Sequence, residues 1–178
     1  MDELNLIIRA KNGDADAFCQ LYDLYRSRLY RYAFYRLGNE SDAEDAVSEC
    51  VLAAWRQIGS LRDEQAFPAW IFRILSGLCA RLIRQQIVRR DQISMDAAPA
   101  GEEKPLHETV PSGAEPADTW VILREALDEL TEDQKELVLL SAVGGLSSKE
   151  IAELTGMAPG SVRSSLSRSL TKVRGYFK

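Results

Sequence analysis

The chain has 178 residues, of which 46% are apolar and 28% charged, and its formal net charge is −5. This length suits one mid-sized domain or two small ones, and the composition is that of an ordinary globular protein. No window carries the roughly 18 apolar residues of a membrane span, and the acidic start "MDELNLIIRA" lacks a signal-peptide cleavage site, so we expect a cytoplasmic protein without membrane insertion.

Three long helices are predicted in the N-terminal half. Apolar residues recur at spacings of three and four across residues 14–37. A second helix is predicted from "NESDAEDAV", with Ser41 as its N-cap and Glu44 as the reciprocal partner. Its buried face would consist of Val47, Val51, Ala54, Trp55 and Ile58. After the polar turn "GSLRDEQ", a third helix should run from about Phe67 to Arg89.

The third helix carries a basic face beside its apolar one. Five residues recur there at spacings of three and four: Trp70, Arg73, Gly77, Arg81 and Arg84. Guanidinium groups bind phosphates and an aromatic ring stacks on an unpaired base, so this face is typical of nucleic-acid binding. Gly77 would let a phosphate approach closely. The alternative is that Trp70 belongs to the core and the arginines only keep the helix soluble.

The middle of the chain is acidic and rich in proline. Residues 91–120 contain one basic residue, Lys104, against seven acidic ones, together with four prolines. Such a segment cannot bury enough apolar surface to offset its ordering entropy. We therefore predict an all-α protein of two small helical domains, residues 1–90 and 119–178, joined by a flexible linker over residues 91–118.

The C-terminal segment predicts a helix-turn-helix. Ser147 and Glu150 form a capping box, so a short helix should begin near Ser148 and stop at Gly156. Pro159 then suits the first position of a second helix. A short helix, a turn containing Gly and a second helix make up this motif.

The second of these helices is strongly two-sided. At about 100° per residue, an apolar arc is formed by Val162, Leu166, Leu170, Val173 and Phe177. The opposite side consists of Arg163, Ser164, Ser167, Arg168, Thr171, Lys172 and Arg174. No acid occurs from Gly156 to Lys178. Because a solvated face normally mixes both charges, this pattern favours a DNA-recognition helix over a merely soluble one.

Cysteine and histidine usage argues against a metal site, a cofactor or an enzyme. Cys19, Cys50 and Cys79 form no C-x-x-C pair and lie among apolar helical positions, so we expect buried free thiols. The only histidine, His107, lies in the proline-rich segment, far from the cysteines. The sequence has no paired catalytic constellation and no Gly-rich phosphate loop.

Taken together, the motifs resemble the extracytoplasmic-function (ECF) sigma factors of bacterial RNA polymerase. "DAEDAVSECVLAAW" is similar to the acidic helix of their region two, and "FPAWIFRI" to the start of that region's DNA-facing helix. The segment from "LDELTEDQKELV" to "SVRSSLSRSLTKVR" is similar to region four. The resemblance covers about 2–90 and 119–176, and it implies a subunit that directs core polymerase to promoters and helps to melt them.

The resemblance also implies roles for individual residues. The acidic helix would bind the clamp of the largest polymerase subunit through Asp42, Glu44, Asp45 and Glu49, although helix capping explains the first three equally well. The loop at residues 59–66 and the basic face of the third helix would bind the minus-ten element. The recognition helix would bind the minus-thirty-five element through Arg163, Ser164, Ser165, Ser167, Arg168 and Lys172. Further expected partners are the flap of the second subunit and an anti-sigma factor.

The sequence departs from the family pattern at several places, and in the recognition helix Ser164–Ser165 stands at the position of the common S-R pair. Gly77 and Arg81 stand where relatives usually have Asn and Asp, and Ser48 and Val51 where they often have Gln and Phe. Ala158 is a poor N-cap before Pro159. The alternative function is a stand-alone helix-turn-helix regulator with an N-terminal sensing or dimerisation domain, which would not need the basic face at Trp70 to Arg84.

Overall fold

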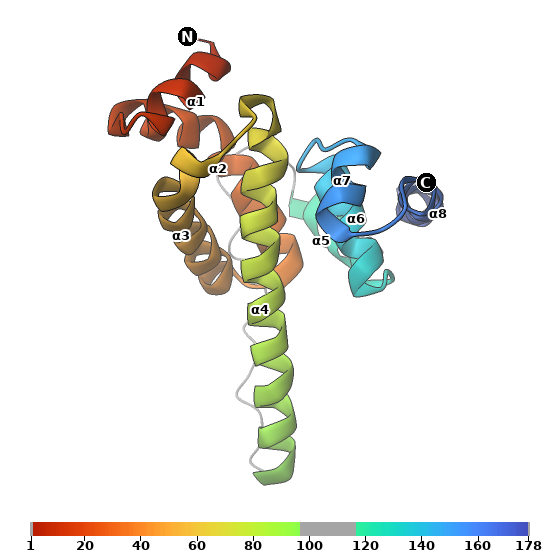
Figure 1. Cartoon of the computed structure of the whole chain (residues 1–178). Coiled ribbons are helices and arrows are strands. Elements are labelled where there is room, and N and C mark those ends of the chain that lie inside the picture. Colours follow the sequence, from red (N-terminus) through yellow and green to blue (C-terminus); the bar gives the residue numbers. More distant parts are fainter. Residues whose placement is uncertain (1, 97–116, 178) are drawn as a thin grey trace.

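All regular elements are helices within the part of the chain that the structure, a computed structural model, describes: residues 2–96 and 117–177 (Figure 1). The N-terminal half contains α1 (Glu3–Lys11), α2 (Ala15–Leu37), α3 (Glu40–Gln57), the 3-10 turns Ile58–Ser60 and Glu64–Ala66, and α4 (Phe67–Asp96). The C-terminal half contains α5 (Ala117–Asp128), α6 (Glu132–Ala142), α7 (Ser148–Thr155) and α8 (Pro159–Gly175). The predicted all-α class is confirmed.

Polar caps define the ends of α2 and the start of α3. The Asp14 carboxylate accepts a hydrogen bond from the Ala17 N–H at 3.0 Å, and α2 ends at Gly38, whose φ of 77° is left-handed. The predicted Ser41 cap is wrong. Asn39 is the N-cap of α3 and its side chain accepts from the Asp42 N–H at 2.8 Å, which places Ser41 inside the first turn.

The core of the N-terminal half lies between α2, α3 and α4, with α1 packed against α2. Large aromatic rings fill it: the Tyr25 and Phe67 centroids lie 5.3 Å apart, and those of Tyr32 and Phe72 lie 5.6 Å apart, both edge to face. Each fully buried side chain of this size stabilises the fold by ~2–3 kcal/mol. The predicted buried position of Trp55 is wrong, because the residue is 37% exposed, although its ring lies 5.1 Å from that of Phe18.

Helix α4 is longer than predicted. It continues beyond Arg89 to Asp96 and projects from the rest of the molecule (Figure 1). No Gly or Pro occurs between Leu78 and Pro99, so no residue in this stretch terminates the helix. By length and composition alone, Glu64–Ile93 passes the criterion for a membrane-crossing helix, a criterion that the core helix of a soluble protein also meets. Its first half nevertheless supplies buried core residues, among them Phe67 and Leu75.

The C-terminal half is held together by α6, which packs against α7 and α8. A capping box of Thr131 and Gln134 starts α6. The core is aliphatic and includes Leu127, Leu137, Leu140, Ile151 and Val162. The helix-turn-helix, α7 and α8, therefore forms one bundle with α5 and α6.

The two halves pack against each other. Helix α6 contacts α2, and α7 contacts α4, so the buried residues of both halves form one cluster. The sequence predicted two separate modules joined by a linker. That linker falls mainly on residues outside the described ranges, as does His107; residues 91–96 belong to α4, and residues 117–118 to α5.

Candidate nucleic-acid interface

The helix-turn-helix is formed by α7 and α8 as the sequence predicts. The Ser147 hydroxyl accepts a hydrogen bond from the Glu150 N–H, and the Glu150 carboxylate accepts one from the Ser147 N–H at 2.8 Å. Gly156 ends α7 with a φ of 75°, and Pro159 is the first residue of α8. Ala158 offers no side-chain cap. The sequence therefore predicted the start, the turn and the second helix correctly.

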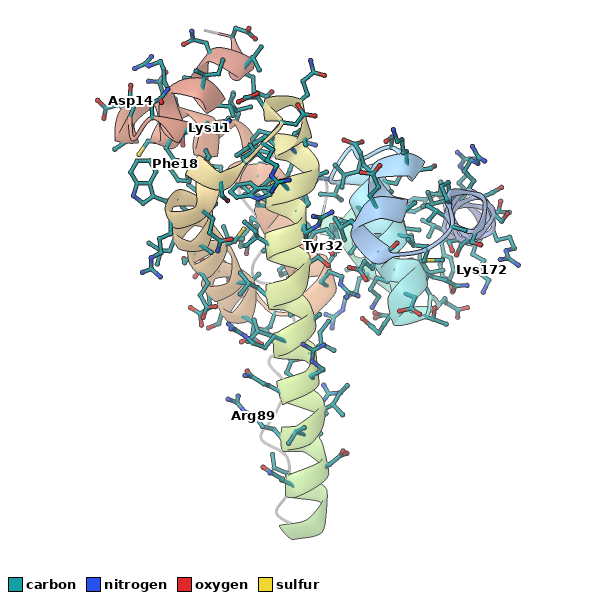
Figure 2. All side chains as sticks on the ribbon, viewed as in Figure 1. Lys11, Asp14, Phe18, Tyr32, Arg89 and Lys172 are labelled. Atoms are coloured by element: carbon teal, nitrogen blue, oxygen red, sulfur yellow. The ribbon has the colours of Figure 1, made fainter. Side chains whose placement is uncertain are left out.

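One side of α8 is buried and the other is open to solvent. The predicted apolar arc is buried or half-buried at Val162, Leu166, Leu170 and Val173, whereas Phe177 is 49% exposed. All the predicted polar residues are exposed, and we call this set the α8 face: Arg163, Ser164, Ser167, Arg168, Thr171, Lys172 and Arg174. Ser165 is half-buried beside it. Figure 2 shows Lys172 pointing outward from the C-terminal half.

Two hydroxyl groups of the α8 face donate hydrogen bonds to the helix itself. The Ser164 Oγ donates to the Gly160 carbonyl at 2.9 Å, and the Thr171 Oγ1 donates to the Ser167 carbonyl at 2.8 Å. Their oxygens therefore remain available as acceptors rather than donors. Such acceptors suit the amino groups of bases in a major groove, beside arginines that donate to guanine or phosphate.

The second predicted surface, which we call the α4 face, consists of Trp70, Arg73, Gly77, Arg81 and Arg84. Its three arginines and Gly77 are exposed, and Trp70 is half-buried. The Trp70 ring lies 5.8 Å from the Phe67 ring, tilted by 39°, so one side of the indole packs on the core. The open part of the ring can still stack on a base, which fits both the core role and the binding role considered for Trp70.

The α4 face is partly occupied by acidic groups. The Arg81 guanidinium forms an exposed ion pair with the Glu49 carboxylate of α3. Arg73 and Gly77 line a cavity of about 410 Å³ that Asp133 and Glu136 of the C-terminal half also line. A polyanion approaching this face would therefore meet carboxylates as well as guanidinium groups.

The predicted polymerase-binding acids differ in how free they are. The Asp42 carboxylate accepts hydrogen bonds from Gln86 Nε2 of α4 at 2.6 Å and from Asn39 Nδ2 at 2.8 Å. Glu44 and Asp45 are exposed on α3, and Glu49 is exposed but paired with Arg81. Asp42 is therefore explained by helix packing, whereas Glu44 and Asp45 remain available to a partner.

The loop before α4 is fixed to the rest of the N-terminal half. Leu61 is buried, the Asp63 side chain caps the short 3-10 turn by accepting from the Gln65 N–H at 3.0 Å, and Glu64 pairs with Lys11 of α1. This pairing helps to lower the pKa of the Glu64 carboxyl. The loop thus lies at the start of the α4 face on a rigid support, where base capture would need it.

The cysteines form no site. Cys50 and Cys79 are buried as predicted, and burial raises the pKa of both thiols to about 12, so both stay protonated. Cys19 is exposed, contrary to the prediction, because it lies on the outer side of α2. Within the described ranges, no three His, Cys, Asp or Glu side chains cluster in a way that could hold a metal ion.

Sequence reasoning missed a polar cluster where the two halves meet. It joins Arg28, Arg36 and Ser76 of the N-terminal half to α6 of the C-terminal half. One signal was present: Arg36 follows the aromatic-rich stretch "YRYAFY" at a position where a buried apolar residue would be expected. A buried arginine requires a partner, and the sequence does not show that the partner lies in the other half.

Comparison with known proteins identifies both halves. The sequence model of sigma-70 region 2 matches residues 21–87, and that of sigma-70 region 4 matches residues 120–173. The ECF RNA polymerase sigma factor SigW of Bacillus subtilis is 28% identical over 176 residues, which cover 94% of this chain and 92% of SigW. EcfG of Rhodopseudomonas palustris is 30% identical over 149 residues, covering 82% of this chain and 76% of EcfG. BldN of Streptomyces coelicolor is 32% identical over 166 residues, or 90% of this chain, which spans only 60% of BldN.

Two solved structures share the fold. CnrH, in complex with the cytosolic domain of CnrY, has a TM-score of 0.69 at 22% identity, covering 98% of this chain and 96% of CnrH. RpoE of Bartonella quintana, in complex with the anti-sigma factor NepR, has a TM-score of 0.69 at 24% identity, covering 90% of this chain and 96% of RpoE. The region 2 match covers residues 21–87, where the alternative function placed a sensing or dimerisation domain. The chain belongs to the ECF sigma factors, the alternative sigma factors that direct bacterial RNA polymerase to specific promoters.

Proposed function

We propose that this sigma factor contacts its promoter through two separate surfaces, the α8 face at the minus-thirty-five element and the α4 face at the minus-ten element. The observation that carries the proposal is that each half exposes a basic face on a helical segment free of acids. These segments are residues 159–177, which include α8, and residues 67–90 of α4. In this proposal residues 1–90 form the region 2 domain, residues 119–178 form the region 4 domain, and residues 91–118 connect them.

The α8 face suits duplex DNA. Arg163 and Arg168 lie about 1.4 turns apart on α8, and each can form a bidentate contact with guanine or a phosphate. Ser164, Ser165, Ser167 and Lys172 would supply the neighbouring acceptor and phosphate contacts. The helix thus enters the major groove with its arginines toward the bases.

The α4 face suits melted DNA. Trp70 offers a ring for an unstacked base, and Arg73, Arg81 and Arg84 offer guanidinium groups to the backbone, with Gly77 between them. Holding an unstacked base on protein lowers the free energy of the melted state. Arg81 replaces the Asp usual in the family, which adds a phosphate contact once Glu49 releases it.

The remaining surfaces fit binding partners rather than substrates. Glu44, Asp45 and Glu49 on α3 would contact the polymerase clamp, with Asp42 positioning the helix start, and the region 4 domain would contact the flap. The two solved relatives, in complex with CnrY and NepR, support an anti-sigma partner for this chain as well. The protein would act in the cytoplasm by binding, without catalysis and without a cofactor.

In vitro transcription with core polymerase tests these assignments. Arg163→Ala with Arg168→Ala should lower promoter-specific transcription by roughly tenfold or more, because each bidentate contact contributes ~1–3 kcal/mol. Trp70→Ala with Arg73→Ala should instead reduce permanganate reactivity of the melted region more than closed-complex formation. Arg124→Ala, an exposed arginine of α5, is the matched control. Normal transcription by both double variants would contradict the proposal, provided that core binding is retained.

A further inference from the structure

A nearly buried arginine holds the two halves together. The Arg36 side chain of α2 is 5% exposed. Its Nη1 lies 2.8 Å from the Glu132 carboxylate and 3.2 Å from the Glu132 carbonyl oxygen, and its Nη2 lies 3.9 Å from the Glu136 carboxylate. Both acids belong to α6. Because packing removes water from the Arg36 guanidinium, the packed arrangement depends on these partners, and removing them would leave a buried charge unpaired.

A second arginine binds the opposite end of α6. Arg28 donates from Nε to the Val143 carbonyl at 3.2 Å and from Nη2 to the Gly144 carbonyl, directly after the last turn of the helix. These carbonyls belong to the C-cap and the residue after it, close to the negative end of the α6 dipole. The guanidinium also lies over the Tyr25 ring at 5.1 Å, which fixes its position. Helix α6 is thus bound at its acidic start by Arg36 and at its carbonyl end by Arg28.

A third contact joins α6 to α4, next to the α4 face. Ser76 of α4 is buried and donates a hydrogen bond to the Glu136 carboxylate. The neighbouring residues Arg73 and Gly77 belong to the α4 face and line the same cavity as Glu136 and Asp133. DNA phosphates at Arg73 would therefore be repelled by two carboxylates and would have to enter a space bounded by α6 and α7.

We propose that the packing of α6 and α7 on α2 and α4 is an autoinhibited state, in which the contacts of Arg28, Arg36 and Ser76 with α6 withhold the α4 face from promoter DNA. The inference rests on the proposed function, in that the α4 face binds the minus-ten element. Apolar packing and polar contacts both hold the closed state, and its ionic part, in which Glu132 is open to solvent, should weaken as salt increases. The apparent affinity for DNA is reduced by the fraction of molecules that are closed.

The full chain offers a direct measurement of closure. Cys19 is exposed whereas Cys50 and Cys79 are buried, so one dye can be placed on Cys19 and a second on Glu153→Cys, an exposed position of α7. Energy transfer between the dyes reports the separation of the two halves. The test variant is Glu132→Gln with Glu136→Gln, which removes both carboxylate partners of Arg36. The control is Glu125→Gln with Glu129→Gln, which removes the same charge from exposed positions of α5 and the turn after it.

The proposal expects three results. Energy transfer falls in the test variant and not in the control, and it falls in the unmodified sequence between about 0.05 and 0.5 M salt. Affinity for single-stranded DNA of mixed sequence, measured by fluorescence anisotropy at low salt, rises about tenfold in the test variant. Arg36→Gln, made from the other side of the contact, gives the same changes, while circular dichroism confirms that each variant is folded.

Two outcomes would overturn the inference, and they differ from failure of the proposed function. Unchanged energy transfer in the Glu132/Glu136 variant would show that these contacts do not hold the closed state. Lower energy transfer without a gain in DNA affinity would show that closure does not withhold the α4 face. Failure of the proposed function would appear separately, as full transcription by Trp70→Ala with Arg73→Ala in the holoenzyme.

Discussion

The α8 face and the α4 face carry similar side chains in different surroundings. On α8, Arg163, Arg168 and Lys172 are exposed, and α8 itself carries no acid. On α4, Arg81 is paired with Glu49, and Arg73 shares a cavity with Asp133 and Glu136. The first surface is ready for a polyanion, whereas the second already has carboxylates where phosphates would bind.

This difference fits the different states of DNA that the two faces are proposed to bind. Duplex DNA is available before melting, so a preformed recognition surface can bind it directly. Unstacked bases appear only during melting. Before then, the carboxylates next to the arginines of the α4 face weaken its non-specific binding to DNA. The acids around the α4 face therefore raise the threshold for binding, whereas α8 itself carries no acid and its arginines are exposed.

The largest expected effect contrasts charge reversal on the two faces in the free chain. Arg163→Glu with Arg168→Glu should weaken binding to mixed-sequence duplex DNA by about 100-fold, because two contacts become repulsions. Arg73→Glu with Arg81→Glu should weaken it only about twofold, since nearby carboxylates already offset these arginines. Fluorescence anisotropy at low salt measures both. Equal losses in the two variants would show that the faces are equally open.

The local elements of the recognition unit were predictable because their signals lie close together in the sequence. Ser147 with Glu150 fixes the start of α7, Gly156 its end and Pro159 the start of α8. The polar side of α8 follows from helical periodicity. The start of α3 was harder, since Asn39 and Ser41 are both good N-caps and only the structure shows that Asn39 binds the Asp42 N–H. The exposure of Cys19 and Trp55 was misjudged because both border the apolar side of their helices.

The contacts between the two halves were not predictable from sequence periodicity. Arg36 and Glu132 are separated by 96 positions. The sequence around one of them does not indicate that the other is its partner. Hydrophobic periodicity shows that a helix has a buried side. It does not show which part of the chain packs against the margin of that side. The same limit applies to Glu49 and Arg81, which were assigned to two different sites and form one ion pair.

A smaller effect distinguishes two glycines, Gly156 at the end of α7 and Gly77 on the α4 face. Gly156→Ala should lower the free energy of unfolding by ~1 kcal/mol, because a φ of 75° is strained for alanine. Gly77→Ala should raise it by ~0.5–1 kcal/mol, since Gly77 is helical and an added Cβ meets no atom within 4 Å. Thermal or denaturant unfolding measures both. If Gly77 admits a phosphate, the stabilised Gly77→Ala variant should still form fewer open complexes, which a purely structural role would not explain.

The smallest effect concerns the ion pair between Glu49 and Arg81. Both side chains are about half exposed, at 57% and 49%, so Glu49→Gln should cost no more than ~0.2–1 kcal/mol of stability. Removing the carboxylate frees Arg81 for a phosphate, and the affinity of the free chain for single-stranded DNA should rise about twofold to threefold. Anisotropy titrations at two salt concentrations measure the gain, which should shrink as salt increases because the new contact is ionic.

Glu44→Gln is the control for this last change, since it removes one negative charge from the exposed side of the same helix without touching Arg81. An equal gain in both variants would assign the effect to net charge rather than to the ion pair. Combining Glu49→Gln with Arg81→Ala adds a second check, because the gain should vanish when the arginine is absent. A gain that persists in this double variant would mean that Glu49 repels DNA directly. The affinity of the α4 face for DNA would then be lowered by repulsion from nearby acids, not by the pairing of its arginines.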